Sequence, residues 1–264
     1  MREFFGFGGY SRPAAGFLSP EHLLFVSFLV TLMIAAAVFF GLRNRDRNFH
    51  EKNKVLCIAA IAIDALELFK IVLTCIRSGN PRDCLYMLPL FLCSIQLIVL
   101  PLAAFSRGRL QQTALDFVLI FGLMGAILGT YGAGNDYSTY PVLCFDNLVS
   151  GLTHTLAGFA SLYIAITGMA SMKRKNLPCT FLILLSFCGA ALLANHLLSY
   201  NYMFLVRGDG TPYDIFYNLV SGHPIWYPTI VISLFLLYIS TYYALFWMIR
   251  RKCAEKHTKN HGSH

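Results

Sequence analysis

The sequence predicts an all-α fold: a polytopic bundle of seven transmembrane helices, with the N-terminus outside and the C-terminus inside. Hydrophobic residues make up 56% of the 264-residue chain and charged residues only 13%. Apolar runs of about 20 residues recur, and such a run crosses a hydrocarbon core of ~30 Å at ~1.5 Å per residue. The predicted spans are residues 21–43, 54–76, 85–106, 112–131, 148–170, 178–200 and 227–249.

The predicted spans divide the chain into three parts. Residues 1–20 form an outer N-terminal segment, 21–249 the seven-helix transmembrane domain, and 250–264 a basic cytoplasmic tail. Glycine and proline interrupt the first 20 residues, which lack the hydrophobic stretch of a signal peptide. We therefore expect a multi-pass membrane protein without a cleavable signal.

Basic residues are distributed unevenly between the two predicted sides of the membrane. Fifteen lysines and arginines fall in the first, third and fifth connecting loops and the tail, whereas five fall in the N-terminal segment and the other loops. Lysine and arginine accumulate on the cytoplasmic side of membrane proteins, which sets the predicted orientation. The net charge of +8 is then a topology signal, and no nucleic-acid partner is expected.

Three ionisable residues lie inside the second predicted span. Asp64, Glu67 and Lys70 follow one another at three-residue steps, which keeps them near one helix face, and Glu67 can pair with Lys70. Charged groups at membrane depth are costly and need a partner or a function. The pattern is compatible with an internal salt bridge that fixes helix packing, and equally with a substrate, ion or proton site.

Further polar residues are predicted to gather in the outer half of the bilayer. Cys93 and Gln96 share one face of the third span, with Cys93 ~12 Å along the helix. His154 lies ~9 Å along the fifth span, which also begins outside. Other polar residues predicted at this level are His22, Asn195, His196 and Asn201.

A thiol and an imidazole at matching depth can form a nucleophile–base pair. The imidazole takes the thiol proton, and the thiolate attacks an ester or thioester carbonyl to give an acyl-enzyme. Residue types alone do not single out Cys93, because buried cysteine is often a small apolar filler and the chain has eight cysteines. A lone intramembrane histidine is likewise often only an interhelical hydrogen-bonding group.

Two cysteines, Cys84 and Cys144, are predicted near the outer surface, where an oxidising compartment permits a disulfide. The sequence does not give their separation, so this pairing stays open. The sequence contains no CxxC, HExxH or Walker-type motif. Neither a metal nor another cofactor is therefore expected.

Several segments resemble a known family. MLPLFLCSIQLIVLPL at 87–102 is similar to the proline–cysteine helix of the YwaF-like integral membrane proteins, and 201–227 is similar to that family's long outer loop. SPEHLLF at 19–25 and the histidine of LTHTLAG at 152–158 fit as well. The resemblance implies a multi-pass protein of the bacterial cell membrane.

Animal relatives of that family are regarded as membrane acyltransferases that act on phospholipids through a cysteine acyl-enzyme. By this resemblance Cys93 is the expected nucleophile and His154 the expected histidine partner. Among the eight cysteines, the resemblance therefore favours Cys93.

These observations lead to one principal hypothesis and two alternatives. The principal one is an integral membrane acyltransferase or lipid hydrolase acting on a membrane acyl-lipid, with Cys93 as nucleophile and His154 as general base. In this hypothesis Gln96 donates a hydrogen bond to the developing oxyanion. His196 or Asn195 is the group that orients the reacting groups or stabilises the oxyanion. The alternatives are a transporter or binding protein using Asp64, Glu67 and Lys70, and a non-catalytic membrane scaffold. The oligomeric state stays open.

Overall fold

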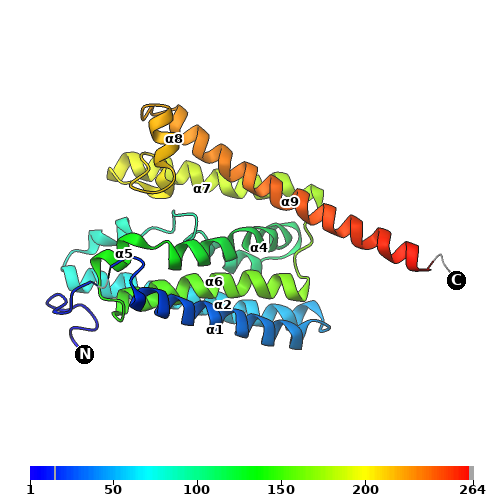
Figure 1. The fold of residues 1–264 in the computed structure, drawn as a ribbon, viewed down its shortest axis with the longest axis horizontal. Coiled ribbons are helices and arrows are strands. Elements are labelled where there is room, and N and C mark those ends of the chain that lie inside the picture. The colour runs from blue at the N-terminus through cyan, green and yellow to red at the C-terminus, as the bar shows by residue number, and fades with distance from the viewer. Residues whose placement is uncertain (15, 262–264) are drawn as a thin grey trace. The chain divides into compact units, whose positions relative to one another are not determined.

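The computed structural model describes residues 1–14 and 16–261, without the side chains of Asn135 and of residues 253–261. Every regular element in this part of the chain is a helix (Figure 1). The chain divides into two compact units, Met1–Ala170 and Ser171–His264. Each unit is described by itself.

The first unit is a bundle in which α6 packs mainly against α1, α2 and α4 and also touches α3. Its long helices are α1 (Pro20–Asn44), α2 (Phe49–Ser78), α4 (Gly108–Tyr131) and α6 (Phe145–Thr167). Its shorter elements are η1 (Pro81–Tyr86), α3 (Gln96–Phe105) and α5 (Gly134–Thr139). Helix α6 contacts α1, α2 and α4, and α3 packs between α2 and α4. Figure 1 shows α1, α2 and α6 running alongside one another.

The second unit consists of two long helices and the loop that joins them. Its long helices are α7 (Leu177–Leu198) and α9 (Trp226–His261), which pack against each other. Three short helices, η2 (Arg174–Asn176), η3 (Tyr202–Phe204) and α8 (Asp214–Leu219), lie before α7 and in the loop.

Five segments are long and apolar enough to cross a membrane: Pro20–Asn44, Gly108–Thr139, Phe145–Thr167, Arg174–Leu198 and Trp226–Lys252. The prediction of an all-helical membrane protein is therefore confirmed. The count of seven spans and their orientation stay predictions. Helix α2 covers the second predicted span but carries more charge than these five segments.

The third predicted span is not one continuous helix. We predicted a helix over 85–106, whereas α3 covers only Gln96–Phe105 and the backbone from Met87 to Ile95 is irregular. Pro89 lacks an N–H and disfavours helical backbone at the residue before it. The Ser94 hydroxyl accepts from the Phe91 N–H at 3.0 Å and donates to the Phe91 carbonyl at 3.1 Å, replacing helical bonds. The helical depth calculated for Cys93 therefore does not apply.

A buried ion pair joins α2, α6 and the N-terminal segment. The Arg77 guanidinium donates to both Asp146 carboxylate oxygens, at 2.6 and 2.8 Å, and also to the Phe5 carbonyl at 3.1 Å. The Tyr10 hydroxyl donates to the same carboxylate at 2.7 Å. The pKa of Tyr10 is raised mainly by burial of its hydroxyl and, to a smaller extent, by this hydrogen bond to Asp146. The N-terminal segment is thereby attached to the end of the bundle through Phe5 and Tyr10.

The ion pair gives a test of what fixes this end of the bundle. Asp146→Leu or Arg77→Met alone leaves one buried charge without its partner, which typically costs about 3–5 kcal/mol. We expect a clear fall in the thermal midpoint of the full-length protein in detergent micelles for each variant. The double variant should be more stable than either single one, because no unpaired charge remains. A double variant that loses the sum of both single effects would contradict this account.

Candidate active site

His154 lies on α6 in a defined tautomer. Its Nδ1 is 2.7 Å from the Ser150 carbonyl oxygen. Because a carbonyl oxygen only accepts, Nδ1 carries the proton and the lone pair is on Nε2. The ring is half-buried. Nε2 is therefore the nitrogen that can act as a base.

Cys93 lies in the irregular backbone that precedes α3. Its thiol lies beside the His154 ring, close enough for the two side chains to interact, and also lies near the backbone N–H groups of Cys93 and Ser94. Nδ1 is already engaged, which leaves Nε2 for the thiol. The structure thus brings the two predicted catalytic residues together, and it does so through a break in the helix that we had expected to be continuous.

Two glycines of α4 make room for this pair. A Cβ atom on Gly125 would lie 3.4 Å from Cys93 Cα and Cβ, and one on Gly129 would lie 1.8 Å from His154 Cδ2. Residues four apart share one helix face, so a single face of α4 receives both side chains. The sequence analysis missed these glycines. Their small-residue spacing, beginning at Gly122, is the signal that would have found them.

A second hydrogen bond supports the His154 anchor. The Ser150 hydroxyl donates to the Asp136 carboxylate at 3.1 Å, while the Ser150 carbonyl accepts from His154. Asp136 belongs to α5, so this short helix holds the turn of α6 that orients the imidazole. The sequence analysis did not identify Asp136 because it lies between two predicted spans.

Gln96, the first residue of α3, is a buried amide without a partner. Its side chain is fully buried, and neither amide atom has a hydrogen-bond partner among the described residues. It follows Cys93 by three residues. An unpaired buried amide is costly, so this group is a candidate to bind a substrate oxygen.

His22 serves a different purpose from His154. Its Nδ1 accepts from the Leu18 N–H and its Nε2 donates to the Thr130 carbonyl, both at 3.1 Å. The ring lies 3.9 Å from that of Tyr137, centroid to centroid. Both nitrogens are occupied, so His22 links α1 to the end of α4 directly after Gly129.

The three ionisable residues of α2 are not equivalent. Glu67 and Lys70 form a half-buried ion pair at 3.7 Å. Lys70 is also within electrostatic reach of His154 and Asp146. Asp64 Oδ1 is buried and has no hydrogen-bond partner in the described part of the chain. The pair fits the packing interpretation, whereas Asp64 keeps the alternative of an ion or proton site open.

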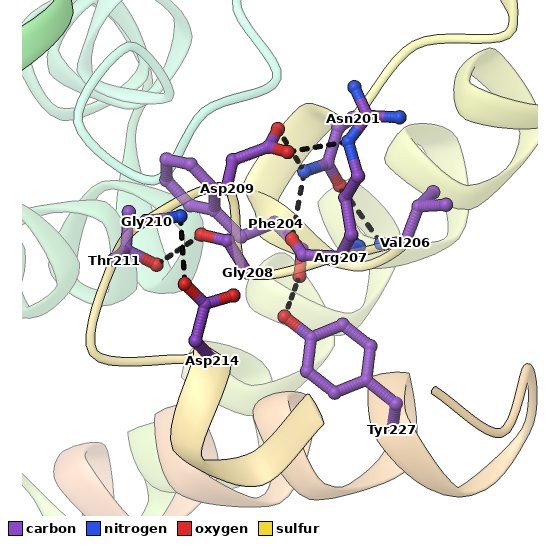
Figure 2. A network of polar contacts seen from close by, with 10 residues as sticks. All are labelled: Asn201, Phe204, Val206, Arg207, Gly208, Asp209, Gly210, Thr211, Asp214 and Tyr227. Carbon is purple, nitrogen blue, oxygen red and sulfur yellow. Dashed lines mark hydrogen bonds and ion pairs between the residues drawn. The ribbon is translucent and has the colours of Figure 1, made fainter. Parts of the chain in front are cut away.

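The remaining predicted residues belong to the second unit. Asn195 accepts from the Tyr202 N–H and donates to the Tyr202 carbonyl, and His196 is exposed. Asn201 donates to the Arg207 carbonyl and to Asp209, each at 2.8 Å (Figure 2). These two amides organise the loop between α7 and α9, and their assignment to the catalytic site stays a prediction.

No disulfide occurs among the described cysteines. Cys84 and Cys144 are both free. The Cys144 sulfur accepts from the Asn147 N–H at 3.5 Å and caps α6. Burial raises the pKa of this thiol, which keeps it protonated. The possible pairing with Cys84 is therefore not realised in this structure.

Comparison with known proteins identifies the family to which the chain belongs. A family model, described as the TMEM164 family, matches residues 17–248. The matched range includes Cys93, Gln96 and His154. No curated protein and no solved structure matches the chain.

The glycine face of α4 provides a test of the site's geometry. Gly129→Ala places a methyl group on the His154 ring, and we expect an overpacking cost of about 1–3 kcal/mol together with slower alkylation of Cys93. Gly189→Ala in α7 is the matched control, because a Cβ there meets no atom within 4 Å among the described residues. Both variants are compared by thermal midpoint and by thiol alkylation. A Gly129→Ala protein as stable and reactive as the parent would contradict the proposed contact.

Proposed function

This chain belongs to the TMEM164 family of transmembrane proteins, and from that premise we propose that it is an integral membrane acyltransferase or lipid hydrolase with Cys93 as its nucleophile. The observation that carries the proposal is that the Cys93 thiol lies beside a His154 ring whose Nδ1 is fixed by Ser150. The narrower resemblance to YwaF-like proteins and a bacterial cell membrane belong to the same proposal.

The acylation step uses the pair directly. His154 Nε2 takes the thiol proton, and the Cys93 sulfur attacks the ester carbonyl of an acyl-lipid. The tetrahedral intermediate expels the alcohol, which leaves as a lysolipid with the proton returned by His154. A thioester between the acyl chain and Cys93 remains.

The second step regenerates the thiol. An acceptor hydroxyl or a water molecule loses its proton to His154 Nε2 and attacks the thioester carbonyl. The new ester or free fatty acid leaves, and Cys93 recovers its proton from the imidazolium. Whether water or an acceptor reaches the thioester distinguishes hydrolysis from transfer.

Gln96 is suited to stabilise the negative charge that develops on the carbonyl oxygen. Its side-chain N–H groups are buried and have no partner among the described residues. Donors fixed in a water-poor site stabilise an oxyanion more strongly than water does, and losing one such donor typically costs 10²–10³-fold in rate. The backbone N–H groups of Cys93 and Ser94 lie near the thiol in the same region.

The irregular backbone around Cys93 also supports a functional interpretation. Non-helical backbone at membrane depth persists where protein or a polar cavity satisfies its polar groups. Here the Ser94 side chain supplies part of that compensation. Pro101 lies inside α3 and removes a further helical N–H. The break between η1 and α3 thus presents the thiol outside a regular helix, where a carbonyl can approach it.

One observation favours a second candidate function. Asp64 has a buried oxygen without a hydrogen-bond partner among the described residues, as an ion or proton site in a transporter would require. Glu67 and Lys70 neutralise each other, so a relay through all three has less support. Proton-coupled uptake that is lost on Asp64→Asn, with no acylation of Cys93, would favour transport. A scaffold would show neither activity.

Acyl-probe labelling tests the nucleophile. Full-length protein in lipid bilayers is incubated with a fatty-acyl activity-based probe, and labelling is measured after washing. We expect Cys93→Ser to abolish labelling and His154→Ala to slow it by about 10²–10⁴-fold, the usual contribution of a general base. Cys179→Ser, a half-buried thiol of α7, is the matched control and should label normally. Undiminished labelling of Cys93→Ser would overturn the proposal.

A further inference from the structure

Six exposed cationic side chains gather at one end of the second unit. They come from the segment before α7 and from the last described side chains of α9. The residues are Lys173, Arg174, Lys175, Arg250, Arg251 and Lys252. We call them the basic cluster.

Trp247 holds the two halves of the basic cluster together, and a second aromatic residue, Phe246, places an arginine within α9. The Trp247 indole N–H donates to the Met172 carbonyl at 2.7 Å, which fixes the segment before α7 against α9. The Arg174 guanidinium lies over the same indole, 5.0 Å from the ring centroid, and that of Arg250 lies 5.7 Å from the Phe246 ring. Cations placed over aromatic faces keep defined positions. The basic cluster therefore has a defined structure, in which the two charged segments are held against each other.

The other end of the unit has the opposite balance. The loop between α7 and α9 contains one arginine, Arg207, which forms an ion pair with Asp209, and a second carboxylate at Asp214 (Figure 2). No carboxylate lies at the basic end among the described side chains. In the sequence, residues 253–264 add two lysines and one glutamate. The second unit is thus strongly polarised along its long helices.

The position of the basic cluster identifies its partner by chemistry. Helices α7 and α9 belong to two of the candidate membrane spans, and the cluster lies where both leave the apolar region. Trp247 is of the residue type that favours the lipid headgroup level. Clustered lysines and arginines beside a membrane helix attract anionic lipids, and arginine in particular pairs with phosphate oxygens.

We propose that the basic cluster is a binding site for the headgroup of an anionic phospholipid. Arg174 and Arg250, placed by Trp247 and Phe246, donate to the lipid phosphate. The neighbouring lysines add long-range attraction. This site is separate from Cys93 and does not depend on the acyl-transfer proposal.

A lipid titration tests this site on the full-length protein in detergent micelles. Fluorescent phosphatidylglycerol is the anionic probe and phosphatidylcholine the zwitterionic comparison. Each nearby cation contributes about fivefold in affinity for anionic lipid, so K173Q/R174Q/R250Q should weaken phosphatidylglycerol binding by at least about tenfold. The charge-matched control is R43Q/R45Q/R47Q, which removes three exposed arginines from the first unit and should leave binding within about twofold.

A variant with unchanged net charge distinguishes lipid binding by positioned arginines from non-specific electrostatic attraction. Trp247→Phe keeps a ring for Arg174 but removes the N–H bond to Met172, and we expect severalfold weaker binding at unchanged net charge. Its elution volume and thermal midpoint report whether it remains folded. Equal losses in the cluster variant and in the charge-matched control would overturn the proposal. So would equal binding of phosphatidylcholine, or stronger binding of polyphosphate or RNA that displaces the lipid.

Discussion

The close approach of α4 to α6 and to the turn before α3 is the constraint on which the first unit depends. Gly129 leaves no space for a side chain, because the His154 ring occupies the position where a Cβ would stand. A Cβ added to Gly125, one turn earlier, would stand 3.4 Å from Cys93, at the short limit of ordinary van der Waals contact. The same helix surface therefore sets the position of the thiol and of the imidazole. Close-packed protein interiors are only slightly compressible and transmit such steric constraints. The packing of the helices therefore fixes the relative position of Cys93 and His154.

Much of this arrangement is encoded in patterns that a sequence can reveal. Apolar runs of membrane length predict the long helices, and they are correct for α1, α4, α6, α7 and α9. The family resemblance also pairs Cys93 with His154, whereas the matching depth that suggested the same pair assumed a continuous helix through Cys93. Hydropathy measures only how apolar a segment is. It cannot show where regular helical hydrogen bonding is interrupted. The stretch from Met87 to Ile95 is as apolar as a span, yet Pro89 and Ser94 redirect its bonds.

Other features depend on contacts between distant parts of the chain, and no local pattern predicts them. Arg77 and Asp146 are separated by 69 residues, and Tyr10 and Asp146 by 136. Asp136 supports His154 only because α5 folds beside the first turns of α6. The two amides Asn195 and Asn201 also have contacts that no local pattern indicates: polarity near a membrane boundary suggested a site, and in the structure both side chains bond within the α7–α9 loop. Polar residues at a helix end serve loop geometry as readily as chemistry.

The buried polar groups of the first unit differ in whether they have hydrogen-bond partners. Arg77, Asp146, His22 and Ser150 all have their partners, and each stabilises the bundle. Gln96 has none among the described residues, and a buried amide in that state costs about 1–3 kcal/mol. A leucine at this position would avoid the cost, so packing alone does not account for a glutamine three residues after the thiol. A substrate carbonyl oxygen would supply the missing acceptor, and it would do so most strongly when it carries negative charge. In the proposed reaction the cost of Gln96 in the free protein would be recovered in the transition state, which is the condition for lowering a reaction barrier.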